Sequence, residues 1–277
     1  MSERKSILCP NCRKLISVDE PACPYCGLLR PGLHNRAGAI RKIFFGSDPV
    51  MTIIYINIAF YVLALFWGGI SDGSTFNFLS PSGYSLFSLG ATGTLPVLGE
   101  HRYWTLISAS FLHGGIFHIL FNMMALYQLG PFVLSEFGFH RFINLYIITG
   151  ICGFAVSILF GVPFTIGASA SICGLIGAII YYGKSRGDHY GDAIYKQAMG
   201  WVVGLIVFGL IFSGINNWAH GGGLLSGIAL ASLMGYNDNK QENAAVKLIA
   251  YACILLTVLV LIWAVVNPLF GVRHISI

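Results

Sequence analysis

The segment TIGASASICGLIGA, Thr165–Ala178, decides the fold because it places small and polar residues inside an otherwise apolar run. Gly174 and Ala178 form a small-xxx-small pair, a spacing that lets two membrane helices approach closely. The full strip of small residues consists of Gly167, Ser169, Ala170, Gly174, Gly177 and Ala178. Packing alone could explain this strip, since a serine in a membrane helix is often bonded to a backbone carbonyl. The alternative is that the hydroxyl of Ser169 takes part in chemistry.

A second small-residue segment, INNWAHGGGLLSGIALA at residues 215–231, is the natural packing partner of the first. Gly223 and Gly227 follow His220 by three and seven residues, so they lie on nearly one face of a helix. Close packing of this face against the strip around Gly174 would bring His220 near Ser169. A serine hydroxyl needs such an adjacent base to become a nucleophile.

A third segment, FLHGGIFHILFNMMALYQLG at residues 111–130, carries His113, His118 and Asn122. The last two are four residues apart and share a helix face. A single His or Asn in a membrane helix is usually a satisfied polar residue that joins helices. Three on one segment favour a functional site, because polar groups inside a bilayer are costly.

Composition places these segments in a membrane. The chain has 277 residues, of which 56% are hydrophobic and 10% are charged, against about 25% charged in ordinary soluble domains. Apolar runs near the length of about 20 residues that crosses a bilayer predict seven spans, of which the fourth and sixth are short. The spans are expected at 51–70, 115–134, 143–160, 168–183, 197–213, 219–235 and 247–266. The polar N-terminus predicts no signal peptide.

The basic residues predict the orientation. With the N-terminus in the cytoplasm, every Lys and Arg except Arg102 and Arg273 falls on the cytoplasmic side, as the positive-inside rule requires. The C-terminus is then extracytoplasmic. The net charge of +5 reflects this topology and a basic face toward the lipid bilayer, and nothing in it calls for nucleic acid.

Before the first span, Cys9-Pro-Asn-Cys12 and Cys23-Pro-Tyr-Cys26 form two CxxC pairs ten residues apart. Four thiolates at this spacing can close a tetrahedral Cys₄ zinc site, which supplies the folding energy of a segment too short for a core. Two disulfides are the alternative, and a reducing cytoplasm disfavours them. A closed site leaves no open position for catalysis, so zinc is expected to be structural and the module to bind an unknown cytoplasmic partner.

These observations predict an all-α polytopic membrane protein with a small N-terminal zinc module. Residues 1–28 form the zinc ribbon and 29–48 a basic linker. Residues 49–236 form a six-helix core, and residues 237–277 form a cytoplasmic connector and a seventh membrane helix. Residues 71–104 are too apolar for an ordinary loop.

Together the three membrane segments resemble the rhomboid intramembrane serine proteases. The family's His-x₄-His-x₃-Asn motif matches His113, His118 and Asn122. Its Gly-x-Ser motif matches Gly167 and Ser169, and its His-x₂-Gly-x₃-Gly motif matches His220, Gly223 and Gly227. The matching positions run from about residue 50 to 236. The N-terminal pattern resembles the zinc ribbons that head some bacterial membrane proteins, which implies a bacterial inner membrane.

The resemblance implies a Ser–His dyad that cleaves transmembrane segments of other proteins. Ser169 would be the nucleophile and His220 its base, without a third acidic residue. His118, Asn122 and the Ser169 backbone N–H would stabilise the oxyanion, while His113 would support the site. The dyad would face an aqueous cavity where spans two, four and six meet. Ser171 is rejected as nucleophile because it lies about 200° around the helix from Ser169.

Three positions depart from the family pattern. Ala170 replaces a glycine and adds a methyl group near the expected oxyanion pocket, Cys173 replaces an aromatic residue, and Thr105 stands where an arginine follows Trp104. The departures at 170 and 105 motivate an alternative, a catalytically silent relative that binds membrane-protein clients. A proton-relaying channel or transporter is the third hypothesis, and it lacks an intramembrane acid to pair with the histidines.

Overall fold

The computed structural model describes most of the N-terminal module and most of the helical part. The described residues are 6–9, 11–12, 14–32, 48–71, 79–212, 214–236 and 243–270. Most of the expected basic linker, most of the expected connector after the sixth span, and the segment after residue 270 that holds Arg273 lie outside them.

The N-terminal module is a small hairpin whose interior is formed by cysteines. Strands β1 (Ser6–Leu8) and β2 (Leu15–Ser17) pair antiparallel, with Leu8 opposite Leu15. Cys9, Ile16 and Cys23 are the buried residues of its core. So small an apolar core agrees with a module that needs another source of stability.

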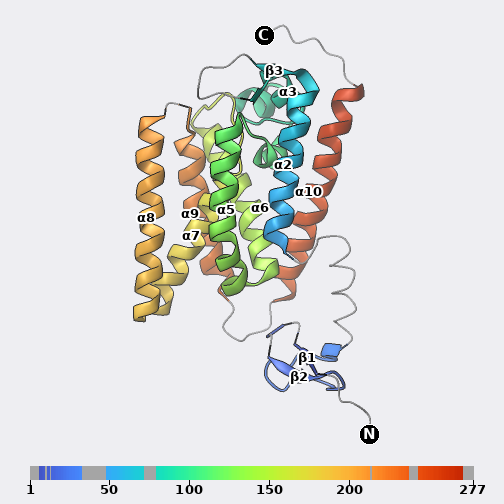
Figure 1. Ribbon diagram of the computed structural model, residues 1–277, viewed down its shortest axis with the longest axis vertical. Coiled ribbons are helices and arrows are strands. Elements are labelled where there is room, and N and C mark those ends of the chain that lie inside the picture. The colour runs from blue at the N-terminus through green and yellow to red at the C-terminus, as the bar shows by residue number, and fades with distance from the viewer. Residues whose placement is uncertain are drawn as a thin grey trace.

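The described residues include seven helices of 18 residues or more, at the seven positions that the hydropathy predicted. They are α2 (Pro49–Gly68), α5 (Ile116–Phe137), α6 (Phe139–Leu159), α7 (Ser169–Arg186), α8 (His189–Ile211), α9 (Asn217–Met234) and α10 (Ala244–Phe270). They form one bundle with α8 at one edge and α10 at the other (Figure 1). The bundle confirms the predicted architecture of a six-helix core followed by a seventh long helix.

Five of these seven helices are both long enough and apolar enough to cross a membrane, and the remaining two are not. The two are α7 and α9, each 18 residues long, which are the helices expected to be short. Their glycines, alanines and serines lower their hydropathy. They pack on each other and on α6, and α7 also packs on α8. A helix that is enclosed by protein need not be as apolar as one that faces lipid.

Glycines set the distance between α7 and α9. A Cβ at Gly223 would collide with the backbone carbonyl of Ala170, and one at Gly227 would collide with that of Gly174. Gly177 on α7 meets the backbone of Leu224 in the same way. The two helices therefore touch backbone to backbone, which is the packing that the small-residue strips predicted.

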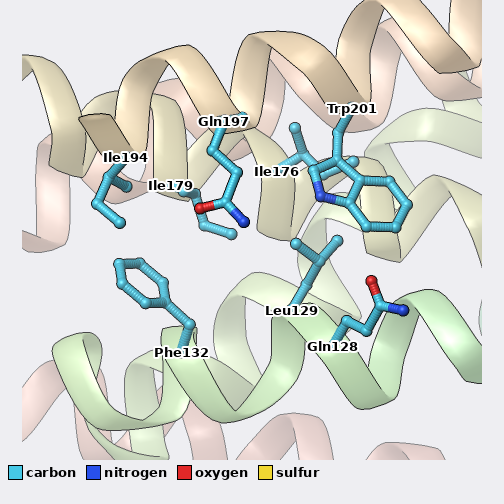
Figure 2. A pocket seen from close by; sticks show the side chains of 9 residues that line it. Gln128, Leu129, Phe132, Ile176, Ile179, Ile194, Gln197 and Trp201 are labelled. Carbon is cyan, nitrogen blue, oxygen red and sulfur yellow. The ribbon is translucent and has the colours of Figure 1, made fainter. Parts of the chain in front are cut away.

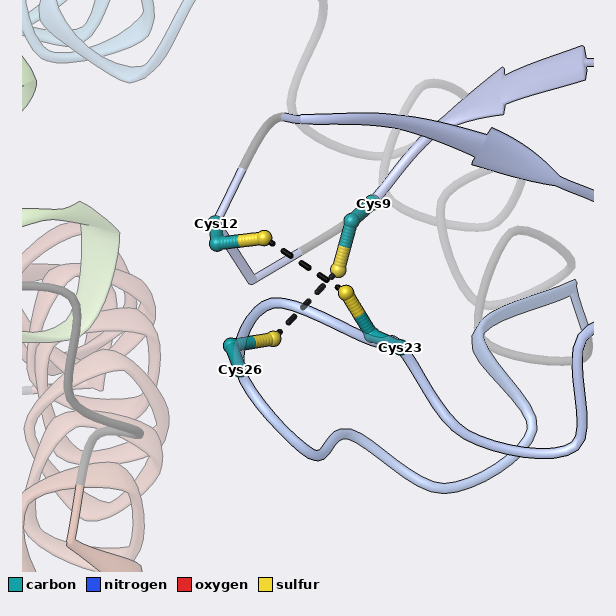
Figure 3. A group of neighbouring side chains, drawn as sticks. All are labelled: Cys9, Cys12, Cys23 and Cys26. Atoms are coloured by element: carbon teal, nitrogen blue, oxygen red, sulfur yellow. Dashed lines mark hydrogen bonds between the residues drawn. The ribbon is translucent and has the colours of Figure 1, made fainter.

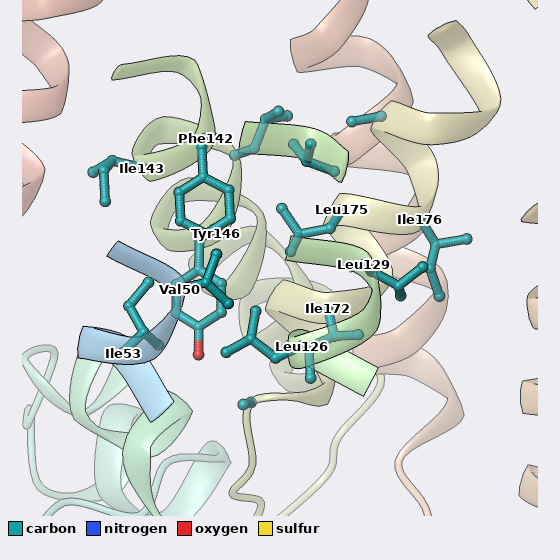
Figure 4. Packing of buried hydrophobic residues seen from close by; sticks show 14 of the residues in the cluster. Val50, Ile53, Leu126, Leu129, Phe142, Ile143, Tyr146, Ile172, Leu175 and Ile176 are labelled. Carbon is teal, nitrogen blue, oxygen red and sulfur yellow. The ribbon is translucent and has the colours of Figure 1, made fainter. Parts of the chain in front are cut away.

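Larger side chains fill the rest of the core. Val50 and Ile53 from α2, Leu126 and Leu129 from α5, Tyr146 from α6 and Leu175 from α7 pack together (Figure 4). At the other side of α6, Asn144 donates to the carbonyl of Val246 at 3.0 Å. This bond fastens the start of α10 to the core.

The described residues between α2 and α5, 69–71 and 79–115, form a cap built of short elements. These are the strand pair β3 (Ile70–Ser71) and β4 (Ser80–Pro81), α3 (Gly83–Ser88), the π-helix η1 (Leu95–Gly99), α4 (Thr105–Ser108) and the 3₁₀-helix η2 (Ala109–Phe111). Leu86, Leu89 and Leu112 pack beside Ala64 of α2. The apolar character of the segment thus comes partly from its own small core.

Arg102 ties this cap together. Its Nη2 donates to the carbonyls of Phe87 at 2.9 Å and Ser88 at 3.3 Å. Its guanidinium lies 4.5 Å from the ring centre of Phe87 and 4.9 Å from that of Trp104. Thr105 is fully buried and donates to the carbonyl of Arg102 at 2.7 Å. An arginine therefore does stack on Trp104, but it comes from two residues before it.

Candidate functional site

Ser169 and His220 meet where α7 and α9 begin. The Nε2 atom of His220 lies 2.8 Å from the Oγ of Ser169, within hydrogen-bonding distance. Ser169 is the first residue of α7, and His220 lies in the first turn of α9. Both side chains are half-buried, so they are held by packing yet reachable.

The other ring nitrogen of His220 has no carboxylate beside it. Its Nδ1 is buried and makes no hydrogen bond within the part of the chain that the structure describes. A serine and a histidine thus form a pair without a third acidic member among these residues.

His118 approaches the same point from α5. Gly167 has a φ of +122°, a conformation that favours glycine. A Cβ built there would lie 2.7 Å from the Nε2 of His118 and 3.7 Å from the Oγ of Ser169. The Nε2 of His118 and the hydroxyl of Ser169 therefore face the same small space, and Gly167 leaves that space open.

A backbone contact assigns the ring proton of His118. The N–H of Gly114 donates to the Nδ1 of His118 at 3.3 Å. In a neutral imidazole only one nitrogen carries a proton, so accepting at Nδ1 leaves the proton on Nε2. His118 therefore presents an N–H donor toward Ser169.

Asn122 and His113 surround His118. Asn122 is buried, and its Nδ2 donates to the carbonyl of His118 at 2.8 Å, which leaves one amide N–H for another acceptor. The ring of His113 is fully buried and packs edge-on against that of His118, with centroids 5.0 Å apart. The structure thus brings all three polar residues of this segment together.

Ala170 was expected to add a methyl group near the oxyanion pocket, and this methyl group is fully buried. It lies in a buried cluster with Phe154 and Ala219 and faces Gly153 of α6. Gly153 provides the room for this methyl group, since a Cβ there would lie 2.9 Å from that of Ala170.

Sequence reasoning missed the part that α6 plays. Spans two, four and six were expected to form the site, yet α6 packs closely against both α7 and α9. Gly153 is the contact point, and a Cβ there would lie 2.6 Å from the carbonyl oxygen of Ala219. Gly153 in the third span was the sequence signal that could have indicated close packing of α6 against the two small-residue helices. Cys173 is buried inside α7, and the structure gives no account of its replacing an aromatic residue.

A separate pocket lies between α5, α7 and α8, away from the dyad (Figure 2). Its walls are mostly apolar, with Gln128 and Gln197 as its amides and Trp201 at one side. Ile176, the lining residue nearest to Ser169 along α7, is seven residues from it, about 10 Å along a helix. The pocket therefore does not include the Ser169–His220 pair.

The four N-terminal cysteines form a second candidate site. Their sulfur atoms all lie within 4.8 Å of one another, and the Cys9–Cys26 and Cys12–Cys23 pairs are each 3.6 Å apart (Figure 3). A disulfide would need about 2.05 Å. Four sulfurs at 2.3 Å from a central ion would be about 3.8 Å apart. The cluster thus fits a tetrahedral metal ion better than two disulfides.

The thiols differ in their readiness to ionise. Burial raises the pKa of Cys9 and raises that of Cys12 to about 12. Burial also acts upward on Cys26, but hydrogen bonds from Asn11, from the backbone of Leu28 and from neighbouring thiols outweigh it and bring its pKa to about 7. A cation among these sulfurs would displace the remaining protons.

Comparison with known proteins finds a family match for part of the helical region. Residues 100–237 match the rhomboid domain. The chain is 31% identical over 214 residues to a Bacillus subtilis (strain 168) protein named rhomboid protease GluP, covering 76% of this chain and 40% of that protein. It is 30% identical over 202 residues to RHOMBOID-like protein 1 of Arabidopsis thaliana, covering 65% of this chain and 51% of that protein.

Another relative carries a different description. Over 151 residues the chain is 28% identical to a protein of Arabidopsis thaliana named inactive RHOMBOID-like protein 8, covering 53% of this chain and 43% of that protein. The chain spans about half, or less, of the length of these three relatives. Similarity across the family therefore extends to a protein described as inactive.

Proposed function

Because the chain carries a rhomboid domain, we propose that it is an intramembrane serine endopeptidase that cleaves transmembrane segments of other membrane proteins. The single observation that supports this most directly is the 2.8 Å contact between Ser169 Oγ and His220 Nε2. A serine inside a helix usually bonds to a carbonyl one turn earlier, and Ser169, as the first residue of α7, has no such carbonyl within that helix. Here the hydroxyl meets the side chain of a base.

In this proposal Ser169 attacks a peptide carbonyl while its hydroxyl proton passes to the Nε2 of His220. The C–N bond then breaks, and His220 returns the proton to the leaving amine. Water attacks the acyl-serine in the second half, giving a proton to His220 and releasing a carboxylic acid as Ser169 is restored. His220 alone serves as acid and base.

Three donors are available for the oxyanion that forms on attack. The Nε2–H of His118 faces Ser169, as its contact with Gly114 indicates. Asn122 retains one amide N–H. The backbone N–H of Ser169 belongs to the first turn of α7, where N–H groups lack acceptors within the helix and the helix dipole is positive. Donors on packed helices are already aimed when the charge develops.

We propose a structural zinc ion for the Cys₄ module, because a closed set of four cysteines fits zinc and leaves no position for a substrate. The module would lie in the cytoplasm with an unidentified partner there, and the dyad would open toward the extracytoplasmic side of a bacterial inner membrane. Among the described residues the number of long helices is odd, which supports placing the N-terminal module and the end of α10 on opposite sides of the membrane.

Labelling with a serine-reactive phosphonate probe tests the enzyme proposal. Purified wild type should be labelled at Ser169, and Ser169→Ala and His220→Ala should lose the label. Ser171→Ala is the matched control, because Ser171 lies on the same helix with its hydroxyl fully buried. It should remain labelled. Cleavage of a model transmembrane substrate should follow the same order.

The opposite result has a definite meaning. A wild-type protein that is folded in detergent but takes no label, and leaves the substrate intact, would support a silent relative that binds membrane-protein clients. The similarity to a relative named inactive keeps that outcome open.

A further inference from the structure

Asn216 begins the helix that carries His220. Its Oδ1 accepts a hydrogen bond from the N–H of Ala219 at 3.1 Å, which is the usual N-cap contact. Its own carbonyl accepts from the N–H of His220 at 3.2 Å. The residue is thus one turn before His220 and in direct backbone contact with it.

The amide nitrogen of Asn216 reaches two other parts of the fold. It donates to the Oγ of Ser157 on α6 at 2.6 Å and to the Oγ1 of Thr165 at 2.9 Å. Ser157 is fully buried and Thr165 nearly so. Both N–H groups of the side-chain amide therefore donate a hydrogen bond, and its oxygen accepts one.

Thr165 is itself held in place and leads to the nucleophile. Its backbone pairs with that of Thr92 through two hydrogen bonds of 2.7 and 3.0 Å. Ser169 follows Thr165 by four residues, as His220 follows Asn216 by four. The segments 165–169 and 216–220 are therefore joined at both ends, by the Asn216–Thr165 contact at one end and the Ser169–His220 contact at the other.

An asparagine suits this position better than another helix cap. Serine, threonine and aspartate can accept the hydrogen bond from Ala219. None of them offers two N–H donors beside that acceptor. The amide therefore does more than begin α9, because it ties the helix to α6 and to the segment before α7.

We propose that Asn216 is a positioning residue that sets the imidazole of His220 against the hydroxyl of Ser169. Below it, the glycine contacts of α9 with α7 fix how close the two helices lie. Asn216 fixes how α9 and α7 are aligned along their axes at the end of the helices where Ser169 and His220 lie. The effect on reaction rate rests on the proposed function, whereas the effect on geometry does not.

The test compares Asn216→Ser with Asn217→Ala. Serine keeps the helix cap but loses both donations. Asn217 stands beside Asn216, and its amide donates to the carbonyl of Gly209 on α8 at 3.0 Å. The control therefore loses a hydrogen bond at the same helix start, but one that does not join α9 to the Ser169 segment.

With the phosphonate probe, Asn216→Ser should lower the saturating labelling rate about tenfold or more, because small misplacements of reacting groups are costly. The probe concentration at half-saturation should change little. Asn217→Ala should label at the wild-type rate. Thr165→Val should slow labelling alone but add nothing in the Asn216→Ser background, since both variants remove the hydrogen bond between Asn216 and Thr165. A wild-type rate in Asn216→Ser, with wild type itself labelled, would overturn this inference and leave the proposed function standing.

A second measurement does not depend on proteolysis. In a Ser169→Cys background, His220 should speed alkylation of the new thiol, as judged against the Ser169→Cys/His220→Ala double variant and followed by mass spectrometry of that peptide. Adding Asn216→Ser should reduce alkylation to near the level without His220. If Asn216→Ser leaves the alkylation rate and its pH profile unchanged, Asn216 does not position His220, whether or not the protein is a protease.

Discussion

Substituting Gly227 by alanine should disturb the dyad from two helical turns away. The added Cβ would lie 2.7 Å from the Cα and 2.8 Å from the carbonyl carbon of Gly174, and closer still to its oxygen. Carbon atoms pack at about 3.5–4.0 Å, so α9 and α7 must separate by roughly 1 Å. The groups that resist are backbone atoms, which no side-chain rotation can move aside.

The size of the effect follows from that displacement. Overpacking of this kind costs about 1–3 kcal/mol of unfolding free energy. A shift of even part of 1 Å at His220 would stretch the 2.8 Å contact with Ser169 toward the length of about 3.5 Å at which a hydrogen bond is lost. We expect the labelling rate of Ser169 to fall about ten- to a hundredfold.

Gly221→Ala is the matched control on the same helix, because a Cβ there meets nothing within 4 Å. It should keep the wild-type labelling rate and gain slightly in helix propensity. Both variants would be measured for thermal unfolding in detergent and for phosphonate labelling. Equal unfolding temperatures and equal labelling rates for Gly227→Ala and Gly221→Ala would refute the backbone-contact argument.

Three further outcomes are expected. His118→Ala should slow labelling and cleavage about a hundredfold or more by removing an oxyanion donor, and an unchanged cleavage rate would remove His118 from that role. Cys9→Ser should release bound metal, measured by atomic emission, without changing Ser169 labelling, and metal affinity in the wild type should fall as pH decreases because thiolates are the ligands. Arg102→Ala should cost about 1–2 kcal/mol of unfolding free energy through its lost carbonyl contacts. Arg102→Lys should lose less, because lysine keeps the charge but lacks the planar fork of arginine. An unaltered thermal midpoint in Arg102→Ala would contradict a stabilising role for Arg102.

The order and number of the long helices could be predicted because hydropathy and length act on each segment separately. The pairing of α7 with α9 was also predictable, since small residues spaced by three and four positions let two helix backbones approach closely. The two short helices were recognised as short from the length of their apolar runs. The cysteine cluster followed from spacing alone, because two CxxC turns can close on one ion without reference to the rest of the chain.

Other features depend on contacts between segments that no local pattern relates. The methyl group of Ala170 faces Gly153 because of how α7 is rotated against α6. Arg102 stacks on Trp104 because the cap folds back over α3. Both contacts could be seen only once the helices were placed.

By itself, the sequence determined which residues could do chemistry here: a serine, two histidines and an asparagine on small-residue or polar helix faces, and four cysteines before them. Only the tertiary structure decided which atoms meet. Periodicity assigns a residue to a face of its own helix, but the depth and rotation of one helix against another come from many packed contacts at once. The contacts of Asn216 with Ser157 and Thr165, 59 and 51 residues away along the chain, therefore appear only in the folded molecule.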